Sequence, residues 1–407
     1  MITNTINNCE VCGNHHLETV LKLGSHPLCD DLVALNDSRA CIEYPIEILF
    51  CPECYTAHQK YQVPKNDLFP KSYHYRYRFT KDVLSGMEKL VDSCIQQLGP
   101  LDGKLVLDIG CNDGSLLDFF KKNGCKTVGI EPTDAYLDGL GHGHDLINGY
   151  FNQITASSIL ERYGKPDIIT FTNVFAHIEN LPDLIQSLLI LSTDNTVFVI
   201  ENHYLGAVIK RNQFDTFYHE HPRTYSLNSF VWIAKSLGKK IVNAEFPSRY
   251  GGNIRVFIGQ SQTEENLYNA ILNNQLELER SFGDALIKMQ VGIDEWKAKM
   301  TDKINNLVTI NGKLKAKAFP GRAAILIKLL NLSSSHIEAV YEKPGSMKIG
   351  HYVPGTRIPI KSDTELFEAY DKTNIIINLA WHISPEIHKY LRESGYSNEI
   401  IDIFPAS

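Results

Sequence analysis

The sequence predicts an α/β protein in three parts: a small cysteine-rich module, a central doubly wound parallel sheet and a second α/β portion. Two cysteine pairs with the same spacing open the chain. From Lys104 onward, apolar strand-like runs alternate with helical patterns, as βαβ units require. A helical stretch over about 264–314 precedes further strand-like runs. We expect the parts to span residues 1–70, 71–260 and 261–407.

The composition is typical of a globular protein that works in water. The chain of 407 residues is 43% hydrophobic and 21% charged, with a net charge of −7. It has no basic run that would follow a phosphate backbone, so we expect no nucleic-acid partner. Its apolar stretches are shorter than the ~20 residues of a membrane span, and the first ten residues do not resemble a signal peptide. We therefore expect a cytoplasmic protein without membrane contact, as a monomer or weak homodimer.

Two C-x-x-C pairs predict a zinc site in the first part. All nine cysteines lie within the first 125 residues, and an odd number argues against a disulfide framework. Two such turns supply the four thiolates that tetrahedral zinc prefers, and neither lies in the βαβ context of a redox motif. Because four thiolates leave no position for water, we expect a structural ion. The predicted ligands are Cys9, Cys12, Cys51 and Cys54.

The elements after this module follow from hydrophobic periodicity. An amphipathic pattern predicts a helix from about Lys81 to Leu98, which Gly99-Pro100 ends. Four strands then alternate with helices; they are KLVLDIG, KTVGIEP, PDIITFTNV and NTVFVIE. The helices between them include SLLDFFKKNG and LPDLIQSLLIL. In the last part, HIEAVYE and NIIINLAW are strand-like and SPEIHKYLRESG is helical.

A glycine loop in the middle part is typical of a nucleotide-type ligand site. It has the sequence LDIGCNDGS and joins the first strand to a helix. Gly110 and Gly114 allow backbone to approach a ligand closely, and Asn112 tolerates left-handed backbone. The spacing G-x-N-x-G lacks the full pyrophosphate cradle of a dinucleotide site. Glu131 ends the next strand, at the position that hydrogen-bonds ribose in nucleotide-binding α/β folds. A glycine turn that binds no ligand is the alternative interpretation.

This loop and its acidic partner resemble those of class I S-adenosylmethionine-dependent methyltransferases more than those of dehydrogenases. The resemblance implies S-adenosylmethionine as the cofactor. The candidate cofactor-binding residues are Asp108, Gly110, Asn112, Gly114, Glu131 and Asn173.

A polar and aromatic cluster, FDTFYHEHP, follows the sheet. Its Tyr218, Glu220 and two histidines suit a metal site, an acid/base cluster or a solvated turn. No third and fourth metal ligand is recognisable nearby, and beside a cofactor pocket the combination favours proton transfer. His177 follows the strand PDIITFTNV and Glu201-Asn202 ends the strand NTVFVIE, so we expect them at the carboxyl edge of the sheet.

The whole chain resembles the three-domain sugar C-methyltransferases of deoxysugar biosynthesis. The resemblance includes the paired C-x-x-C, IGCNDGSLL, GIEP, NVFAHI, FDTFYHEH, YGGNIRVF, HYVPGTRIPI and INLAWHISPEI. It implies a zinc-binding module, a central class I methyltransferase domain and a C-terminal Rossmann-like domain. It also implies a nucleotide-linked 4-keto-deoxysugar substrate that lies between the last two domains.

The same resemblance implies a mechanism. His221 would remove the C3 proton beside the 4-keto group, and the enolate carbon would accept the methyl group. Tyr218, Glu220 and His177 would orient this base or bind the keto oxygen. An upstream tyrosine would contribute similarly; it is Tyr73 or Tyr75, and spacing favours Tyr73.

The sequence departs from the family pattern at two places. Tyr77-Arg78 stands where small or hydroxyl residues are usual, and KAFPGRAA at 317–324 replaces a glycine- and alanine-rich loop. Arg76, Arg78 and Arg322 either pair with the substrate diphosphate or lie on a solvated surface. Two alternative functions are O- or N-methylation of a sugar or small metabolite, and a zinc-module interaction protein with a degenerate methyltransferase domain.

Overall fold

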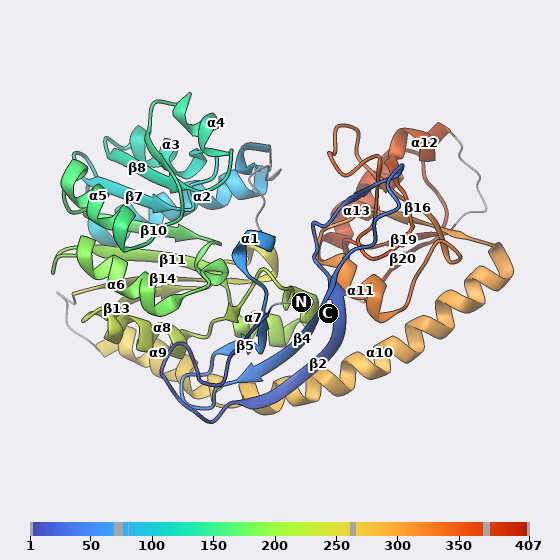
Figure 1. Cartoon of the computed structure of the whole chain (residues 1–407), viewed down its shortest axis with the longest axis horizontal. Coiled ribbons are helices and arrows are strands. Elements are labelled where there is room, and N and C mark those ends of the chain that lie inside the picture. The colour runs from blue at the N-terminus through green and yellow to red at the C-terminus, as the bar shows by residue number, and fades with distance from the viewer. Residues whose placement is uncertain (1–2, 69–75, 80, 261–265, 369–374, 405–407) are drawn as a thin grey trace.

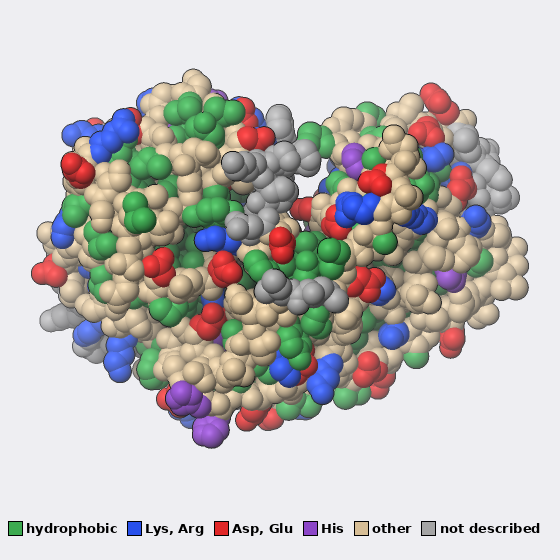
Figure 2. All heavy atoms as spheres, in the orientation of Figure 1, with side chains coloured by type: hydrophobic (Ala, Val, Ile, Leu, Met, Phe, Trp, Pro, Cys, Tyr) green, Lys and Arg blue, Asp and Glu red, His purple; other side chains and the backbone are tan. Residues whose placement is uncertain are grey.

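The chain forms two α/β parts that stand side by side, with long N-terminal strands running beneath and between them (Figure 1). The two α/β parts remain separate lobes at the upper edge of the view in Figure 2. This computed structural model describes residues 3–68, 76–79, 81–260, 266–368 and 375–404.

The middle part is built on a seven-stranded sheet in the order β13-β14-β11-β10-β7-β8-β9. Its strands are β7 (Leu105–Ile109), β8 (Lys126–Glu131), β9 (Asp145–Asn148), β10 (Ile168–Thr172), β11 (Val197–His203), β13 (Lys240–Glu245) and β14 (Asn253–Gly259). Its helices are α2 (Lys81–Leu98), α3 (Ser115–Lys122), α4 (Tyr136–Leu140), α5 (Gln153–Tyr163), α6 (Leu181–Leu191), α7 (Leu205–Lys210) and α8 (Leu227–Ser236).

Helices cover both faces of this sheet, which confirms the predicted doubly wound α/β architecture. Val106 of β7 packs in a core with α2 and α3, whereas its neighbour Leu107 packs on the other face with α5, α6 and α8. The alternation follows from the two-residue period of a strand.

One strand departs from the predicted parallel arrangement. Strand β14 is antiparallel to both of its neighbours, β11 and β13. Only residues 246–252 connect β13 to β14, which is too short for the crossover that a parallel pair needs.

From β7 the chain adds β8 and β9 on one side of the sheet and then adds β10 and β11 on the other side, so the direction of strand addition reverses at β7. In open α/β sheets, such a switch point leaves a ligand crevice at the carboxyl ends of the strands. The predicted glycine loop follows β7, and Asn173 follows β10. The fold therefore brings both to the same place.

The N-terminal part forms a sheet with the order β12-β5-β4-β2. Three of its strands come from the module itself, namely β2 (Glu18–Pro27), β4 (Glu43–Phe50) and β5 (Ala57–Gln59). The fourth, β12 (Arg223–Thr224), comes from the middle part and directly follows His221-Pro222. Two short strand pairs and one helical turn complete the module: β1 (Asn4–Thr5) with β6 (Tyr61–Gln62), β3 (Val33–Ala34) with β17 (His351–Tyr352), and α1 (Lys65–Leu68).

The C-terminal part is a five-stranded parallel sheet in the order β18-β16-β15-β19-β20, as the Rossmann-like expectation requires. Its strands are β15 (Leu314–Lys317), β16 (Ile337–Glu342), β18 (Ile360–Ser362), β19 (Ile376–Asn378) and β20 (Ile400–Asp402). Its helices are α11 (Ala323–Leu329), α12 (Asp363–Glu368) and α13 (Ser384–Glu393).

The predicted helical connector is two helices, α9 (Asn266–Glu279) and α10 (Phe282–Asn311). Helix α10 runs along the base of the molecule toward the C-terminal part (Figure 1). It buries Leu286, Met289 and Ile293, a helical spacing, in a core that also contains residues of the N-terminal and middle parts. The three parts therefore share one continuous core.

Among the described residues, none of the helices combines the length and the apolar composition that a membrane crossing needs.

Candidate active site and metal centre

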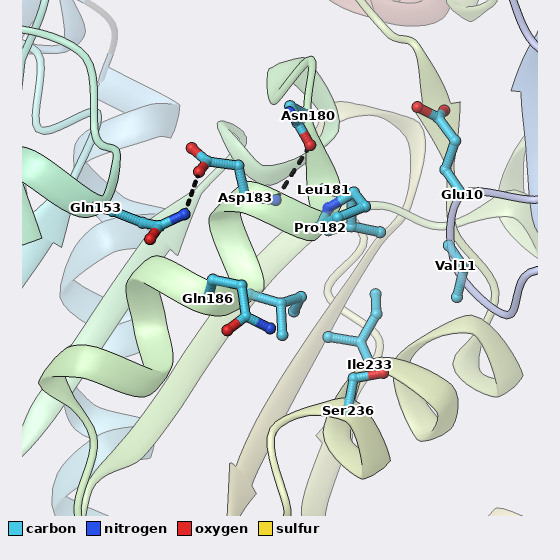
Figure 3. Close-up of a pocket in the computed structure, with 11 residues that line it drawn as sticks. Glu10, Val11, Gln153, Asn180, Leu181, Pro182, Asp183, Gln186, Ile233 and Ser236 are labelled. Atoms are coloured by element: carbon cyan, nitrogen blue, oxygen red, sulfur yellow. Dashed lines mark hydrogen bonds between the residues drawn. The ribbon is translucent and has the colours of Figure 1, made fainter.

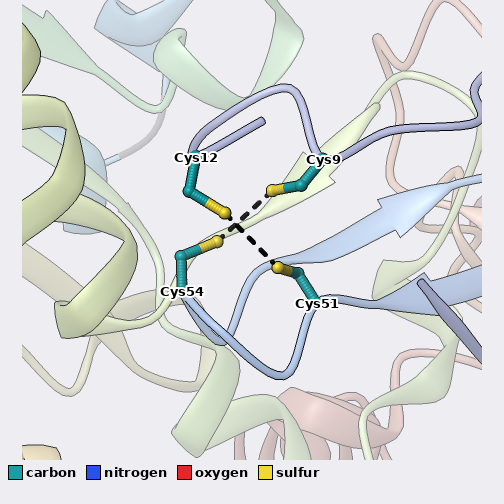
Figure 4. Close-up of side chains that lie close together, drawn as sticks. All are labelled: Cys9, Cys12, Cys51 and Cys54. Carbon is teal, nitrogen blue, oxygen red and sulfur yellow. Dashed lines mark hydrogen bonds between the residues drawn. The ribbon is translucent and has the colours of Figure 1, made fainter. Parts of the chain in front are cut away.

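The four predicted zinc ligands converge on one point (Figure 4). Sulfur atoms of Cys9 and Cys54 lie 3.4 Å apart and those of Cys12 and Cys51 lie 3.5 Å apart. All four sulfurs lie within 4.8 Å of one another. A tetrahedron with Zn–S bonds of about 2.3 Å has edges of about 3.8 Å, so the donor set fits zinc.

Each cysteine pair forms the same tight turn. The amides of Gly13 and Tyr55 donate to the carbonyls of Cys9 and Cys51, both at 2.9 Å. Gly13 and Tyr55 both adopt left-handed backbone, with φ of 79° and 58°. The equal C-x-x-C spacing produces equal turns, which is why the sequence pattern identified this site.

The cofactor loop owes its shape to three left-handed residues. Gly110, Asn112 and Gly114 have φ of 74°, 50° and 76°. A Cβ on Gly110 would lie 2.6 Å from Val174, so this position requires glycine. The loop therefore exposes backbone at the switch point, where a ligand can approach it.

Two buried carboxylates end the strands at this loop, and one of them, Glu131, binds it directly. The Asn112 amide donates to Glu131 Oε2 at 3.0 Å, and Thr133 donates to Glu131 Oε1 through its amide and its hydroxyl. Burial raises the pKa of Asp108 to about 7, although Thr170 Oγ1 donates to its carboxylate at 2.7 Å. Glu131 thus holds the loop while it lies at the end of β8, where ribose binds in related sheets.

Asn173 lies beside this loop at the carboxyl end of β10. It adopts left-handed backbone, with φ of 53°, and its side-chain oxygen accepts a hydrogen bond from Asn253 at 3.2 Å. Glu201, at the corresponding end of β11, is fully buried and pairs with Arg255 at 2.7 Å. The Glu201 carboxylate is therefore neutralised by an arginine of the protein itself.

Two of the three candidate diphosphate-binding arginines pair with acidic residues on the cofactor side. Arg76 pairs with Asp134 and Asp138, both at 2.8 Å, and Arg78 contacts Asp113 at 3.1 Å. The positive charge of each arginine therefore has an acidic partner within the protein. These ion pairs hold the segment before α2 against the cofactor loop.

The predicted histidines meet in one cluster. Ring centroids of His177 and His221 lie 4.8 Å apart, and Tyr218 lies 4.3 Å from His221. His203, at the end of β11, is 5.4 Å from His221. His219 contributes nothing here, because its Nε2 donates to the Tyr44 carbonyl at 3.0 Å.

The Thr216 carbonyl fixes the tautomer of His221, the candidate base, and His177 lies against the Glu220 carbonyl. Nδ1 of His221 lies 3.0 Å from the Thr216 carbonyl, and Nδ1 of His177 lies 2.7 Å from the Glu220 carbonyl. A carbonyl only accepts, so Nδ1 of His221 carries the proton and its Nε2 keeps its lone pair. Burial, together with His177 and His203, lowers the pKa of His221 well below its usual value. His221 is therefore a neutral imidazole at pH 7.

The two other motif residues favour their neutral forms. Burial raises the pKa of Tyr218 well above its usual value, and Glu220 adds to this effect. Burial and Asp30 also raise the pKa of Glu220. Tyr218 therefore stays a phenol that can donate a hydrogen bond next to His221, and burial favours the protonated form of Glu220.

The C-terminal part adds an arginine to this region. Arg322 lies 3.2 Å from Asp215, and its guanidinium is 5.5 Å from the centre of the Trp381 ring. The Trp381 indole also donates to Asp215 at 3.0 Å. Arg322 has only 11% of its side chain exposed, so the solvated-surface interpretation is wrong for this residue.

A separate cavity of about 500 Å³ lies between the middle part and the zinc module (Figure 3). It is bordered by α5, α6, α8 and the Glu10-Val11 turn of the zinc module. Of the predicted catalytic and cofactor-binding residues that the structure describes, none lines it.

Sequence models of three domain families match the chain in order. The one described as "Putative zinc binding domain" matches residues 9–69, and the one described as "Methyltransferase domain" matches residues 83–244. The one described as "C-methyltransferase C-terminal domain" matches residues 248–400. The chain belongs to the three-domain C-methyltransferases. Its cofactors are S-adenosylmethionine and a structural zinc ion, as predicted.

Individual relatives of this C-methyltransferase differ in how much of it they match. C-methyltransferase NovU from Streptomyces niveus is 28% identical over 395 residues, 95% of this chain and 92% of that protein. A ubiquinone biosynthesis O-methyltransferase from Glaesserella parasuis serovar 5 is 35% identical over 107 residues, 24% of this chain and 45% of that enzyme. The structure of magnesium protoporphyrin IX methyltransferase from Synechocystis PCC 6803 with bound SAH matches with a TM-score of 0.35 and 14% identity. That match covers 47% of this chain and 90% of the other.

Sequence reasoning missed several residues near His221 or Arg322 in this C-methyltransferase. They are His203, Asp215, Trp381 and His382. His203 ends β11 and Trp381 follows β19, so the rule that ligands bind at carboxyl ends of strands identifies both positions. Tyr73 and Tyr75 lie outside the described residues.

Proposed function

We propose that this C-methyltransferase acts on C3 of a nucleotide-diphospho-4-keto-deoxysugar, in deoxysugar biosynthesis. The observation that carries the proposal is the buried, neutral imidazole of His221, whose Nδ1 proton is held by the Thr216 carbonyl. A base that must abstract a proton from carbon needs an available lone pair, and Nε2 has one.

In the proposed reaction, His221 Nε2 removes the proton from C3 of the substrate. The C–H electron pair becomes the enolate, and negative charge develops on the 4-keto oxygen. Tyr218 donates a hydrogen bond to this oxygen, with His177 and Glu220 beside it, and such donors lower the barrier by stabilising charge as it forms. C3 then attacks the electrophilic methyl group that S-adenosylmethionine supplies. Tyr73 or Tyr75 would assist from the segment before α2.

We assign cofactor binding to the carboxyl edge of the middle sheet. Gly110, Asn112 and Gly114 would contact the cofactor through backbone, and Glu131 would accept hydrogen bonds from the ribose. Asp108 and Asn173 flank this loop on β7 and β10. The nucleotide sugar would lie where the middle and C-terminal parts meet, near Arg322. The proposed domain boundaries are 1–70, 71–260 and 261–407.

The experiment that tests this function identifies the atom that receives the methyl group. Full-length protein is incubated with a 4-keto nucleotide sugar and S-adenosylmethionine carrying a ¹³C-labelled methyl group, and the product is examined by NMR. The proposal expects the label to correlate with ring carbon C3. A label on oxygen or nitrogen would establish the alternative, heteroatom methylation. Binding of S-adenosylmethionine without transfer to any substrate would support the degenerate interaction protein.

A further inference from the structure

The zinc module contacts the backbone on both sides of His221. Strand β5 pairs antiparallel with β12, two residues after this histidine. The backbone amide of Gln59 donates to the Pro222 carbonyl at 2.8 Å. Its side-chain amide donates to the Phe217 and Tyr218 carbonyls at 3.0 and 3.3 Å. Gln59 is 1% exposed, so these bonds do not compete with solvent. One residue of the module therefore fixes the chain before and after the candidate base.

A buried arginine extends this contact to the second histidine. Arg223 has no exposed surface, and its Nη1 donates to Glu10 at 2.6 Å and to the Glu179 carbonyl at 3.4 Å. Its Nη2 donates to the carbonyl of Ile178, the residue after His177. The guanidinium thus joins the zinc module to the segment that carries His177.

Glu10, the acidic partner of Arg223, belongs to the metal centre. Glu10 stands between Cys9 and Cys12 in the first turn. His58 of β5 lies 3.3 Å from the Cys9 sulfur and 3.7 Å from the Glu10 carboxylate. The turn that ligates the metal therefore also sets the position of the carboxylate that neutralises Arg223.

We propose that the zinc module positions His177 and His221 for proton transfer, through Glu10, Arg223 and Gln59, in addition to stabilising the fold. These three are positioning residues, since none is argued to touch substrate. Residues that orient a metal centre or reacting groups through hydrogen bonds typically change activity about 10–100-fold when they are replaced. Misplacing a reacting group by about 1 Å costs about 100-fold. The inference rests on the proposed function for its catalytic meaning.

The test compares zinc-loaded full-length variants with a matched control. Glu10→Gln keeps the size of the side chain but removes its charge, and Gln59→Ala removes the contacts to Phe217 and Tyr218. Arg223→Lys keeps the charge but not the fork that reaches two carbonyls. The control is Glu47→Gln on the same module, where the carboxylate pairs with Lys60 at 2.7 Å instead.

Four measurements are made on each variant. Zinc content and S-adenosylmethionine affinity report an intact module and methyltransferase domain. Spectra of ¹⁵N-labelled histidine rings, assigned with His177→Asn and His221→Asn, report which ring nitrogen carries the proton. The rate of deuterium uptake at C3 of the substrate in D₂O, without methyl donor, reports proton transfer.

The proposal expects wild-type zinc content and cofactor affinity in the three variants, with mixed tautomers at His177 or His221 and exchange slowed about 10–100-fold. Glu47→Gln should match wild type in all four. Unchanged ring spectra and exchange would overturn the inference, as would exchange that falls only in proportion to lost zinc. If wild-type protein itself shows no exchange, the proposed function fails, while the ring spectra still decide the coupling.

Discussion

The middle and C-terminal sheets of this C-methyltransferase share one architectural detail and differ in another. In the middle sheet, Glu131 at the end of β8 accepts a hydrogen bond from the Asn112 amide at 3.0 Å. In the C-terminal sheet, Glu342 at the end of β16 accepts one from the Phe319 amide at 2.5 Å. Each glutamate ends the second strand and holds the loop that follows the first.

The loops themselves are different. The middle loop has glycine at 110 and 114, whereas Lys317 ends β15 and is only 1% exposed. Its ammonium group lies 2.9 Å from Asp363, and Tyr390 donates to the same carboxylate at 2.7 Å. The C-terminal sheet therefore has a buried ion pair at the position where the middle sheet exposes backbone. Strand order and a terminal carboxylate do not by themselves make a cofactor site; the residues of the loop decide.

The ion pair of the C-terminal sheet gives the largest expected effect. Lys317→Met leaves the Asp363 carboxylate buried without its cation, which should lower the free energy of unfolding by about 3–5 kcal/mol. Urea unfolding of the full chain measures this change. S-adenosylmethionine affinity, measured below the unfolding transition, should stay at the wild-type value. A loss of cofactor affinity in the folded variant would mean that the C-terminal sheet contributes to that site.

A substitution in the glycine loop of the middle sheet should instead weaken cofactor binding. Gly110→Ala places a Cβ 2.6 Å from Val174 at a φ of 74°, so the loop must shift. We expect S-adenosylmethionine affinity to fall about 100-fold by calorimetric titration. Ala318→Gly, at a left-handed position of the C-terminal loop, is the matched control and should leave affinity unchanged. Equal affinity in both variants would refute the assignment of the cofactor to the middle sheet.

The two equivalent glutamates sharpen the comparison further. Glu131→Gln removes a charged acceptor from the proposed ribose position and should weaken S-adenosylmethionine binding about tenfold. Glu342→Gln makes the same chemical change in the other sheet, where we expect no effect on this binding. The same titration measures both variants, and a matching loss in Glu342→Gln would contradict the proposed division of roles.

The remaining prediction concerns acid stability, where the effect grows by only a small step with each pH unit. Burial, with Arg322, lowers the pKa of both His203 and His382 to about 3. Unfolded imidazoles bind a proton below pH about 6.5, whereas these two remain neutral in the fold. Stability should therefore be complete above pH 6.5 and fall toward pH 3, by about 1.4 kcal/mol per pH unit for each ring.

Variants isolate this contribution from that of the zinc site. His203→Asn and His382→Asn should each flatten the dependence of unfolding free energy on pH between 6.5 and 4, measured by urea unfolding. Since the metal centre is the same in all three proteins, its own acid sensitivity cancels. An unchanged slope in both variants would show that these rings take up protons in the folded chain.

Local sequence predicted the parts of the site that local geometry determines. The C-x-x-C spacing sets each turn at Cys9 and Cys51, and the positive φ of Gly110 demands a residue without a side chain. Helix α2 begins and ends where its pattern and Gly99 indicate. In each case the conformation of the local backbone carries the signal.

The remaining features depend on segments far apart in the sequence. Asp215 meets Arg322 and Trp381 only because the two α/β parts pack together, and no local pattern encodes that meeting. The pairing of β5 with β12 is also unpredictable locally, because β12 has only two residues. The sequence left two roles open for Arg78, because its partner Asp113 lies 35 positions away in the chain.

Deuterium exchange at C3 of a 4-keto nucleotide sugar, in D₂O and without methyl donor, tests the central claim most directly. Wild-type protein should exchange this hydrogen, and His221→Asn should slow the exchange about 10²–10⁴-fold. His142→Asn, which alters a partly exposed ring paired with Asp118, is the control and should exchange at the wild-type rate. Exchange undiminished in His221→Asn, or absent from wild type with every candidate sugar, would contradict the account.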